Sequence, residues 1–313
     1  MSRGRVNVLD CELDESLDRA GFRHGAVSIG QRIGAAHLGA AVYEAEAGHP
    51  IWPYHYHCAT EEWLYVAAGA PVLRDAGGRR VLRRGDLVCF PAGQLGAHSI
   101  EGPGRFIVFS TDAPGPYIGV FPDSDKIAIA LAVGDELDVL AVPRCAAIDY
   151  WQGEGSEAPS GPVEVTRETA APSRPVVNAL DEPVLAAALG AQRLEATVLA
   201  LEPGAGGDEY HYAHGREEWA LVLAGAPTLR GAEGEDVLRE GDLVCFPEGP
   251  AGAHRLTNGG DAVVHVLCLS TTGLPVNVCY PDSSRWLMRN EPGSEGRMFQ
   301  DAVGGVEGDA PAV

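Results

Sequence analysis

Two histidines stand two residues apart in the stretch WPYHYHCATEEWLYVAAGAP, residues 52 to 71, and two glutamates follow closely. Alternate residues of a β-strand point to the same face, so we expect the imidazoles of His55 and His57 to lie side by side. A turn over CAT then reverses the chain and brings a carboxylate opposite them, and His98 follows after a second strand and a loop. Imidazoles and one carboxylate that converge in this way form a site suited to Fe, Mn, Ni, Co, Cu or Zn. Open coordination positions would remain for a substrate.

A near copy of this stretch, DEYHYAHGREEWALVLAGAP, occupies residues 208 to 227. From Glu61 to His98 the two copies align without a gap at a constant offset of 156 residues, and farther out VNVLD at residue 6 answers VNALD at residue 177. A repeat of this length indicates duplication of one ordinary domain.

Short β-branched and aromatic runs, separated by Gly, Pro and Asp turns, fill each repeat. Their spacing of about 8 to 12 residues predicts an all-β barrel or sandwich. Helical signals are weak and are strongest in EPVLAAALGAQRLEA, residues 182 to 196. Residues 153–175 are rich in Gly, Pro, Ser and Glu, which is typical of a linker. We therefore expect an N-terminal domain over 1–152, a C-terminal domain over 176–302 and a loose tail over 303–313.

The composition limits the partners that the chain can have. It has 313 residues, 45% of them hydrophobic, and its 23 basic and 44 acidic residues give a net charge of −21. This charge repels nucleic-acid phosphates and anionic lipid surfaces, so neither is an expected partner. The N-terminus has no apolar signal region and no apolar run is long enough to span a bilayer, which predicts a cytoplasmic protein. Seven cysteines without paired short spacings argue against a disulfide framework.

The stretch HYHCATEEWLYVAAG resembles the first motif of the cupin superfamily, in which HxH is followed by a glutamate and a glycine. GDLVCFPAGQLGAH is similar to the second motif, although its loop is two residues longer before the histidine. The resemblance covers both repeats and implies a bicupin: two tandem double-stranded β-helix (jelly-roll) barrels with short helical extensions. It implies a metal site of His55, His57, Glu62 and His98. Glu62 is chosen over Glu61 by its spacing to the motif glycine, because strand parity alone does not decide.

The second repeat departs from the motif at one position. His211, Glu218 and His254 match, but Ala213 stands in the place of the second histidine. His214, one residue on, should point away unless the strand bulges. The remaining two histidines and one carboxylate could act as a facial triad for non-haem iron. The other interpretation, which we prefer, is a weaker or vestigial site in a barrel kept for stability and dimer geometry.

The resemblance does not select a reaction, because cupins with this ligand set include dioxygenases, decarboxylases, isomerases and epimerases. We expect one divalent transition metal ion, iron before Mn, Ni, Cu or Zn, and assign no catalytic residue. The leading prediction is a metal-dependent oxidoreductase of the dioxygenase type, acting on a small chelating organic substrate in the N-terminal barrel. The alternatives are an isomerase, epimerase or lyase that uses the metal as a Lewis acid, and a non-catalytic binding protein. A homodimer is a further expectation.

Overall fold

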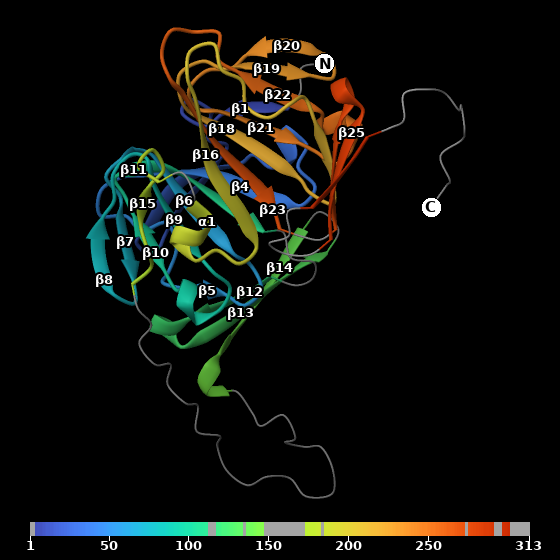
Figure 1. Cartoon of the computed structure of the whole chain (residues 1–313). Helices are drawn as coiled ribbons and strands as arrows, with labels where there is room; N and C mark the ends of the chain where they lie inside the picture. The colour runs from blue at the N-terminus through green and yellow to red at the C-terminus, as the bar shows by residue number, and fades with distance from the viewer. Residues whose placement is uncertain are drawn as a thin grey trace, which may run out of the picture.

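The computed structural model describes residues 4–111, 117–133, 136–146, 173–182, 185–272, 275–290 and 296–300. These residues form two antiparallel β-barrels that pack side by side (Figure 1). The all-β, two-barrel prediction is therefore confirmed. No helix within these ranges is long and apolar enough to cross a membrane. The tail predicted at 303–313 and most of the linker predicted at 153–175 lie outside the described residues.

The N-terminal barrel combines a seven-stranded sheet with two smaller sheets. The large sheet has the order β15-β9-β6-β11-β4-β3-β2 and consists of β2 (Glu15–Arg19), β3 (Phe22–Ser28), β4 (Leu38–Ala45), β6 (Glu62–Gly69), β9 (Asp86–Phe90), β11 (Gly104–Thr111) and β15 (Val177–Asn178). The smaller sheets have the orders β10-β7-β8 and β14-β13-β12-β5 and consist of β5 (Tyr56–His57), β7 (Val72–Asp75), β8 (Gly78–Val81), β10 (Ser99–Glu101), β12 (Tyr117–Phe121), β13 (Lys126–Val133) and β14 (Glu136–Pro143).

The C-terminal barrel repeats this plan with a five-stranded sheet and two smaller ones. The large sheet has the order β1-β21-β18-β23-β16 and consists of β1 (Arg5–Asn7), β16 (Leu194–Leu201), β18 (Glu218–Ala224), β21 (Asp242–Phe246) and β23 (Val264–Thr271). The smaller sheets have the orders β20-β19-β22 and β17-β24-β25-β26 and consist of β17 (Tyr212–His214), β19 (Thr228–Gly231), β20 (Gly234–Val237), β22 (His254–Thr257), β24 (Val276–Tyr280), β25 (Arg285–Arg289) and β26 (Arg297–Gln300).

Helices are short throughout the described chain. The α-helix α1 (Leu185–Leu189) covers only part of the helical signal at 182–196, because the later residues of that segment begin β16. The other helical elements are the 3-10 turns η1 (Gln31–Ile33), η2 (Gln94–Gly96), η3 (Pro122–Ser124), η4 (Arg144–Ala146), η5 (Pro250–Gly252) and η6 (Pro281–Ser283).

The central strands of the two large sheets are apolar on both faces because each face packs against a different core. Along β6, Trp63 and Tyr65 enter a core shared by the two barrels, whereas Leu64 and Val66 fill the interior of the N-terminal barrel. The alternation follows from the period of two in a β-strand. The C-terminal barrel is built in the same way, with Trp219 in the shared core. The ring of Trp219 lies edge-on to Phe109 of the other barrel, with centroids 6.1 Å apart.

Each large sheet also contains a short strand from the opposite half of the chain. Strand β1, near the N-terminus, pairs with β21 of the C-terminal barrel, and β15 pairs with β9 of the N-terminal barrel. Figure 1 shows β1 in the upper barrel and β15 in the lower one. The two strands lie in the matching stretches VNVLD and VNALD. The exchange is therefore reciprocal.

Two buried carboxylates hold the halves together near the sites described below. Glu61 is 0% exposed, and its carboxylate accepts backbone N–H groups from residues 192, 193 and 194 of the other half, the shortest at 2.7 Å. Glu217 is likewise 0% exposed and accepts the N–H groups of residues 36 to 38, the shortest at 2.6 Å. Each carboxylate also accepts the indole N–H of the tryptophan two residues on. These hydrogen bonds tie each half of the chain to the other, so we call Glu61 and Glu217 the carboxylate anchors.

Candidate metal centre

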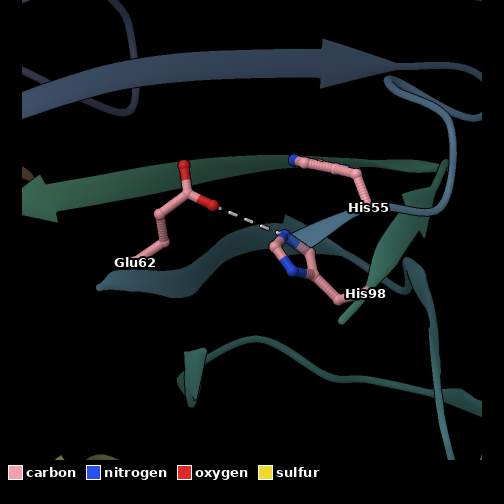
Figure 2. Close-up of side chains that lie close together, drawn as sticks. All are labelled: His55, Glu62 and His98. Atoms are coloured by element: carbon pink, nitrogen blue, oxygen red, sulfur yellow. Dashed lines mark ion pairs between the residues drawn. The ribbon is translucent and has the colours of Figure 1, made fainter. Parts of the chain in front are cut away.

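The N-terminal barrel brings four predicted ligands together from three segments. His55 and His98 face each other across an antiparallel bridge in which each donates its backbone N–H to the other's carbonyl oxygen, at 3.0 and 2.8 Å. His57 ends β5, which pairs with β12, and Glu62 begins β6. Figure 2 shows the side chains of His55, Glu62 and His98 directed toward a common point.

Short distances join all four side chains. The Nε2 atom of His57 lies 2.8 Å from Oε2 of Glu62 and 3.1 Å from Nε2 of His55. The Nε2 atom of His98 lies 3.8 Å from the same oxygen of Glu62. The three histidines are buried, and Glu62 is largely so. Donor atoms of His55, Glu62 and His98 all lie within 4.8 Å of one another, and His57 joins them through its contacts with His55 and Glu62.

Backbone carbonyl groups fix the orientation of two of these rings. The Nδ1 atom of His55 lies 2.8 Å from the carbonyl oxygen of Pro53, and that of His98 lies 2.8 Å from the carbonyl oxygen of Gly96. A hydrogen bond from Nδ1–H assigns the proton to that nitrogen and leaves the Nε2 lone pair for a metal. The ring of His98 also stacks on Phe90, with centroids 3.6 Å apart.

The pKa shifts of three residues in this cluster favour the charge states that metal ligands need. Burial lowers the pKa of His98 to about 3, and neighbouring His55 adds to the effect. Burial, together with His57, likewise lowers the pKa of His55. Burial opposes ionisation of Glu62, but the adjacent imidazoles, His57 first, outweigh it and lower its pKa to about 2. At neutral pH His55 and His98 therefore offer unprotonated nitrogen atoms beside the ionised carboxylate of Glu62.

The crowding around His57 is a test of whether a cation fits. Its Nε2 atom faces both the bare Nε2 of His55 and a carboxylate oxygen of Glu62, and one ring proton can serve only one of these acceptors. A divalent cation bound between them would satisfy both Nε2 atoms and the carboxylate oxygen at once. The residues therefore fit a divalent transition metal with nitrogen and oxygen ligands.

The structure also separates the two neighbouring glutamates. Glu62 faces the histidines, and Glu61, on the opposite face of the chain, is the carboxylate anchor that binds the backbone of the other half. This is the arrangement that the motif spacing favoured. The turn before β6 resets the register, which is why strand parity could not make the choice.

A cavity of about 380 Å³ opens beside the N-terminal cluster. Its lining is mainly apolar and aromatic: Tyr43, Ile51, Trp52, Leu64, Phe90, Ile100, Val108, Tyr117, Gly119, Phe121, Ala128, Ala130 and Val139, with His55, Glu62 and His98. Among these lining residues there is no lysine and no arginine. We call this space the N-terminal cavity.

Tyr117 is a site residue that the sequence analysis missed. Its hydroxyl oxygen lies 2.8 Å from Nε2 of His57. Burial of the hydroxyl end, with the nearby charge of Glu62, raises the pKa of Tyr117, so the hydroxyl keeps its proton at neutral pH. The repeat gives no signal for it, because the register of β24 places Val276 at the corresponding position.

The C-terminal barrel assembles the three ligand types that its sequence retains. Donor atoms of His211, Glu218 and His254 all lie within 4.8 Å of one another, and Nε2 of His211 is 3.7 Å from Oε2 of Glu218. Ala213, which replaces the fourth ligand, is buried, whereas His214 is exposed. Although burial opposes it, the carboxylate of Glu218 raises the pKa of His211. This imidazole therefore holds a proton more firmly than His55, its counterpart.

The C-terminal barrel has its own cavity, of about 300 Å³, with a charged lining. Glu195, Asp208 and Arg216 line it together with the three ligand-type residues. Nη2 of Arg216 donates to Oε2 of Glu195 at 2.7 Å, and its Nη1 lies 3.9 Å from Oε1 of Glu218. The sequence analysis missed Arg216, although the alignment of GREEW with ATEEW places it against Thr60. We call this space the C-terminal cavity.

Comparison with known proteins agrees with the architecture. The family model described as "Cupin domain" matches residues 41–110 and 197–270, one segment in each barrel. No curated protein matches the chain. With one cupin domain in each half, the chain is a tandem two-domain cupin.

Solved structures resemble it at low identity. A variant of oxalate decarboxylase from Bacillus subtilis has 16% sequence identity, covers 86% of this chain and 77% of its own, and has a TM-score of 0.49. A second structure of that enzyme, whose manganese(II) centres were studied, has 15% identity, coverage of 86% and 77%, and a TM-score of 0.46. A sugar phosphate isomerase of the cupin superfamily from Silicibacter pomeroyi has 26% identity, covers 42% of this chain and 85% of its own, and has a TM-score of 0.36.

Proposed function

We propose that this protein is a metal-dependent oxidoreductase of the dioxygenase type. Its N-terminal barrel would hold one divalent metal ion, with iron as the first candidate, through His55, His57, Glu62 and His98. The substrate would be a small organic molecule that chelates the metal through oxygen atoms. The observation that carries the proposal is the convergence of three imidazoles and one ionised carboxylate beside an apolar cavity.

The ligand set supports the metal. A redox-active ion held by neutral imidazoles and one carboxylate keeps positive charge and open positions, through which it can bind a chelating substrate and activate dioxygen. The protein's part is to keep His55 and His98 unprotonated, which their burial does, and to orient their rings, which their carbonyl contacts do.

The N-terminal cavity supports an apolar, aromatic or enolic substrate. A phosphate ester or a second free carboxylate would need a cationic partner, and no lysine or arginine is among the lining residues. Rings such as Trp52 and Phe121 would instead pack against a flat organic molecule. The protonated hydroxyl of Tyr117 would donate a hydrogen bond to a substrate oxygen beside His57. Exclusion of water by this lining would protect a reactive substrate.

A Lewis-acid isomerase or lyase is the competing function. Such a reaction moves a proton and needs an acid or base that is free of the metal. In the N-terminal cavity, Glu62 would serve as a ligand, so the hydroxyl of Tyr117 is the group left for that role. A hydroxyl with a raised pKa is a weak acid and is scarcely ionised at neutral pH, so it is a poor proton donor and offers little phenolate as a base. This favours chemistry carried out by metal and dioxygen.

Metal analysis of protein purified without added metal, followed by oxygen-uptake assays with phenolic, enolic and carboxylic substrates, tests the proposal. We expect about one iron per chain and oxygen uptake with a phenolic or enolic compound. His57→Ala should lose both, whereas the exposed histidine variant His214→Ala should keep both. Zinc without oxygen uptake would support the Lewis-acid function, and a protein that binds no metal would contradict both functions.

A further inference from the structure

We propose that the C-terminal cavity is a binding site for a small carboxylic acid, held by the guanidinium group of Arg216. The site is separate from the N-terminal metal centre and does not depend on the function proposed for it. The ligand would carry a hydroxyl or ammonium group next to its carboxylate, as in 2-hydroxy and 2-amino acids.

Arg216 is placed to receive an anion. Its side chain is 16% exposed and lines the C-terminal cavity. One of its nitrogen atoms, Nη2, donates to Glu195, but the buried Nε has no hydrogen-bond partner. A buried N–H donor without a partner is costly, and a carboxylate oxygen would satisfy it. Glu195 is half exposed, so its own pairing with Arg216 competes with solvent.

The same residue opposes a metal at this site. A guanidinium group is charged at all accessible pH values, and this one has a nitrogen 3.9 Å from Glu218, the carboxylate that a metal would need. Two positive charges at such a separation repel each other. Ala213 also removes one imidazole donor. Compared with the N-terminal barrel, this barrel therefore has one metal ligand fewer and carries a guanidinium group beside the remaining ones.

The lining also contains a second guanidinium group, that of Arg255, and several hydrogen-bond acceptors. Glu218 and Asp208 both line the cavity. His211 and His254 use Nδ1 on backbone carbonyl oxygens at 2.8 Å, which turns their Nε2 atoms toward Glu218. A ligand that offers only a carboxylate would leave these acceptors unused. A neighbouring hydroxyl or ammonium group would donate to them, and a space of about 300 Å³ limits the ligand to a small molecule.

Titration calorimetry of the full-length, chelator-treated protein with lactate, alanine and acetate tests the proposal. Lactate or alanine should bind at least about tenfold more tightly than acetate, because each adds a donor for the acidic lining. Lactate and alanine distinguish the hydroxyl from the ammonium form of the ligand. Arg216→Gln should weaken the tighter ligand at least about tenfold. Arg239→Gln, which removes an exposed arginine that pairs with Asp10, should leave binding unchanged.

A second variant keeps the test decisive if Arg216→Gln does not fold. Ala220→Leu introduces the residue that the N-terminal barrel carries as Leu64 and fills part of the cavity without changing charge. It should also weaken binding at least about tenfold. The proposal would be overturned if none of the three compounds bound at millimolar concentration, if acetate bound as tightly as the others, or if both cavity variants bound like the wild type.

Discussion

The two cavities are built on the same backbone but offer a ligand opposite environments. In the N-terminal cavity Trp52, Tyr43 and Leu64 make an apolar wall, and in the C-terminal cavity Asp208, Leu199 and Ala220 stand at the corresponding positions. Near the metal-ligand positions the two barrels differ at two places. Ala213 of the C-terminal barrel aligns with His57, and Arg216 aligns with Thr60. Neither change alters the local register, because β5 pairs with β12 in the same way as β17 pairs with β24. The comparison teaches that a few inward-facing side chains set the charge of each cavity's lining.

The largest expected effect is a difference between two equivalent histidines, His98 of the N-terminal barrel and His254 of the C-terminal barrel. His98→Ala should lower metal affinity by more than about 100-fold and abolish activity, because it removes a ligand whose supporting contacts alone are worth 10- to 100-fold in typical sites. His254→Ala should leave both nearly unchanged. Metal content and turnover of the two purified variants provide the measurement. A His254→Ala protein as inactive as His98→Ala would show that the functional barrel has been assigned wrongly.

An intermediate effect should follow from converting the C-terminal site to the N-terminal pattern. The double variant Ala213→His with Arg216→Thr restores the fourth ligand and removes the competing cation. We expect its metal content to rise from about one to about two ions per chain, as measured by elemental analysis.

The single variant Arg216→Thr is the matched control, since it removes the cation without adding a ligand, and it should gain less metal. A double variant that still binds one ion per chain would contradict the proposal that Arg216 and the missing histidine prevent metal binding in the C-terminal barrel.

The smallest effect concerns acid stability of the metal-free protein. The pKa of His98 falls from about 6.5 in an unfolded chain to about 3 in the fold, so between these values the unfolded state binds one more proton. Stability from this group is therefore present above about pH 6.5 and is lost as the pH falls toward 3. His98→Gln should reduce the slope of unfolding free energy against pH by up to about 1.4 kcal/mol per pH unit. Denaturant titrations between pH 4 and 6.5 measure it, and equal slopes would contradict the buried neutral imidazole.

Much of the fold and of the N-terminal cluster was predictable because both depend on local patterns. The period of two placed His55 and His57 together, and motif spacing selected Glu62. Tyr117 and Arg216 were not predictable. Their roles depend on which strands become neighbours after the chain has closed into barrels, and neither has an equivalent in the other repeat. The carboxylate anchors were also missed, because their donors are backbone N–H groups more than a hundred residues away.

The reciprocal exchange of β1 and β15 has a consequence for the order in which the protein is made. During synthesis, Asn7 must wait for Asp242, its hydrogen-bond partner 235 residues later, and β9 must wait for β15. Glu61 is likewise without its backbone donors until residues 192–194 have left the ribosome. The first half of the chain therefore cannot complete its sheet as it emerges, in contrast to tandem domains that fold one after the other. The nascent N-terminal barrel therefore reaches its final form only after the first segments of the C-terminal half, up to residue 194, have been translated.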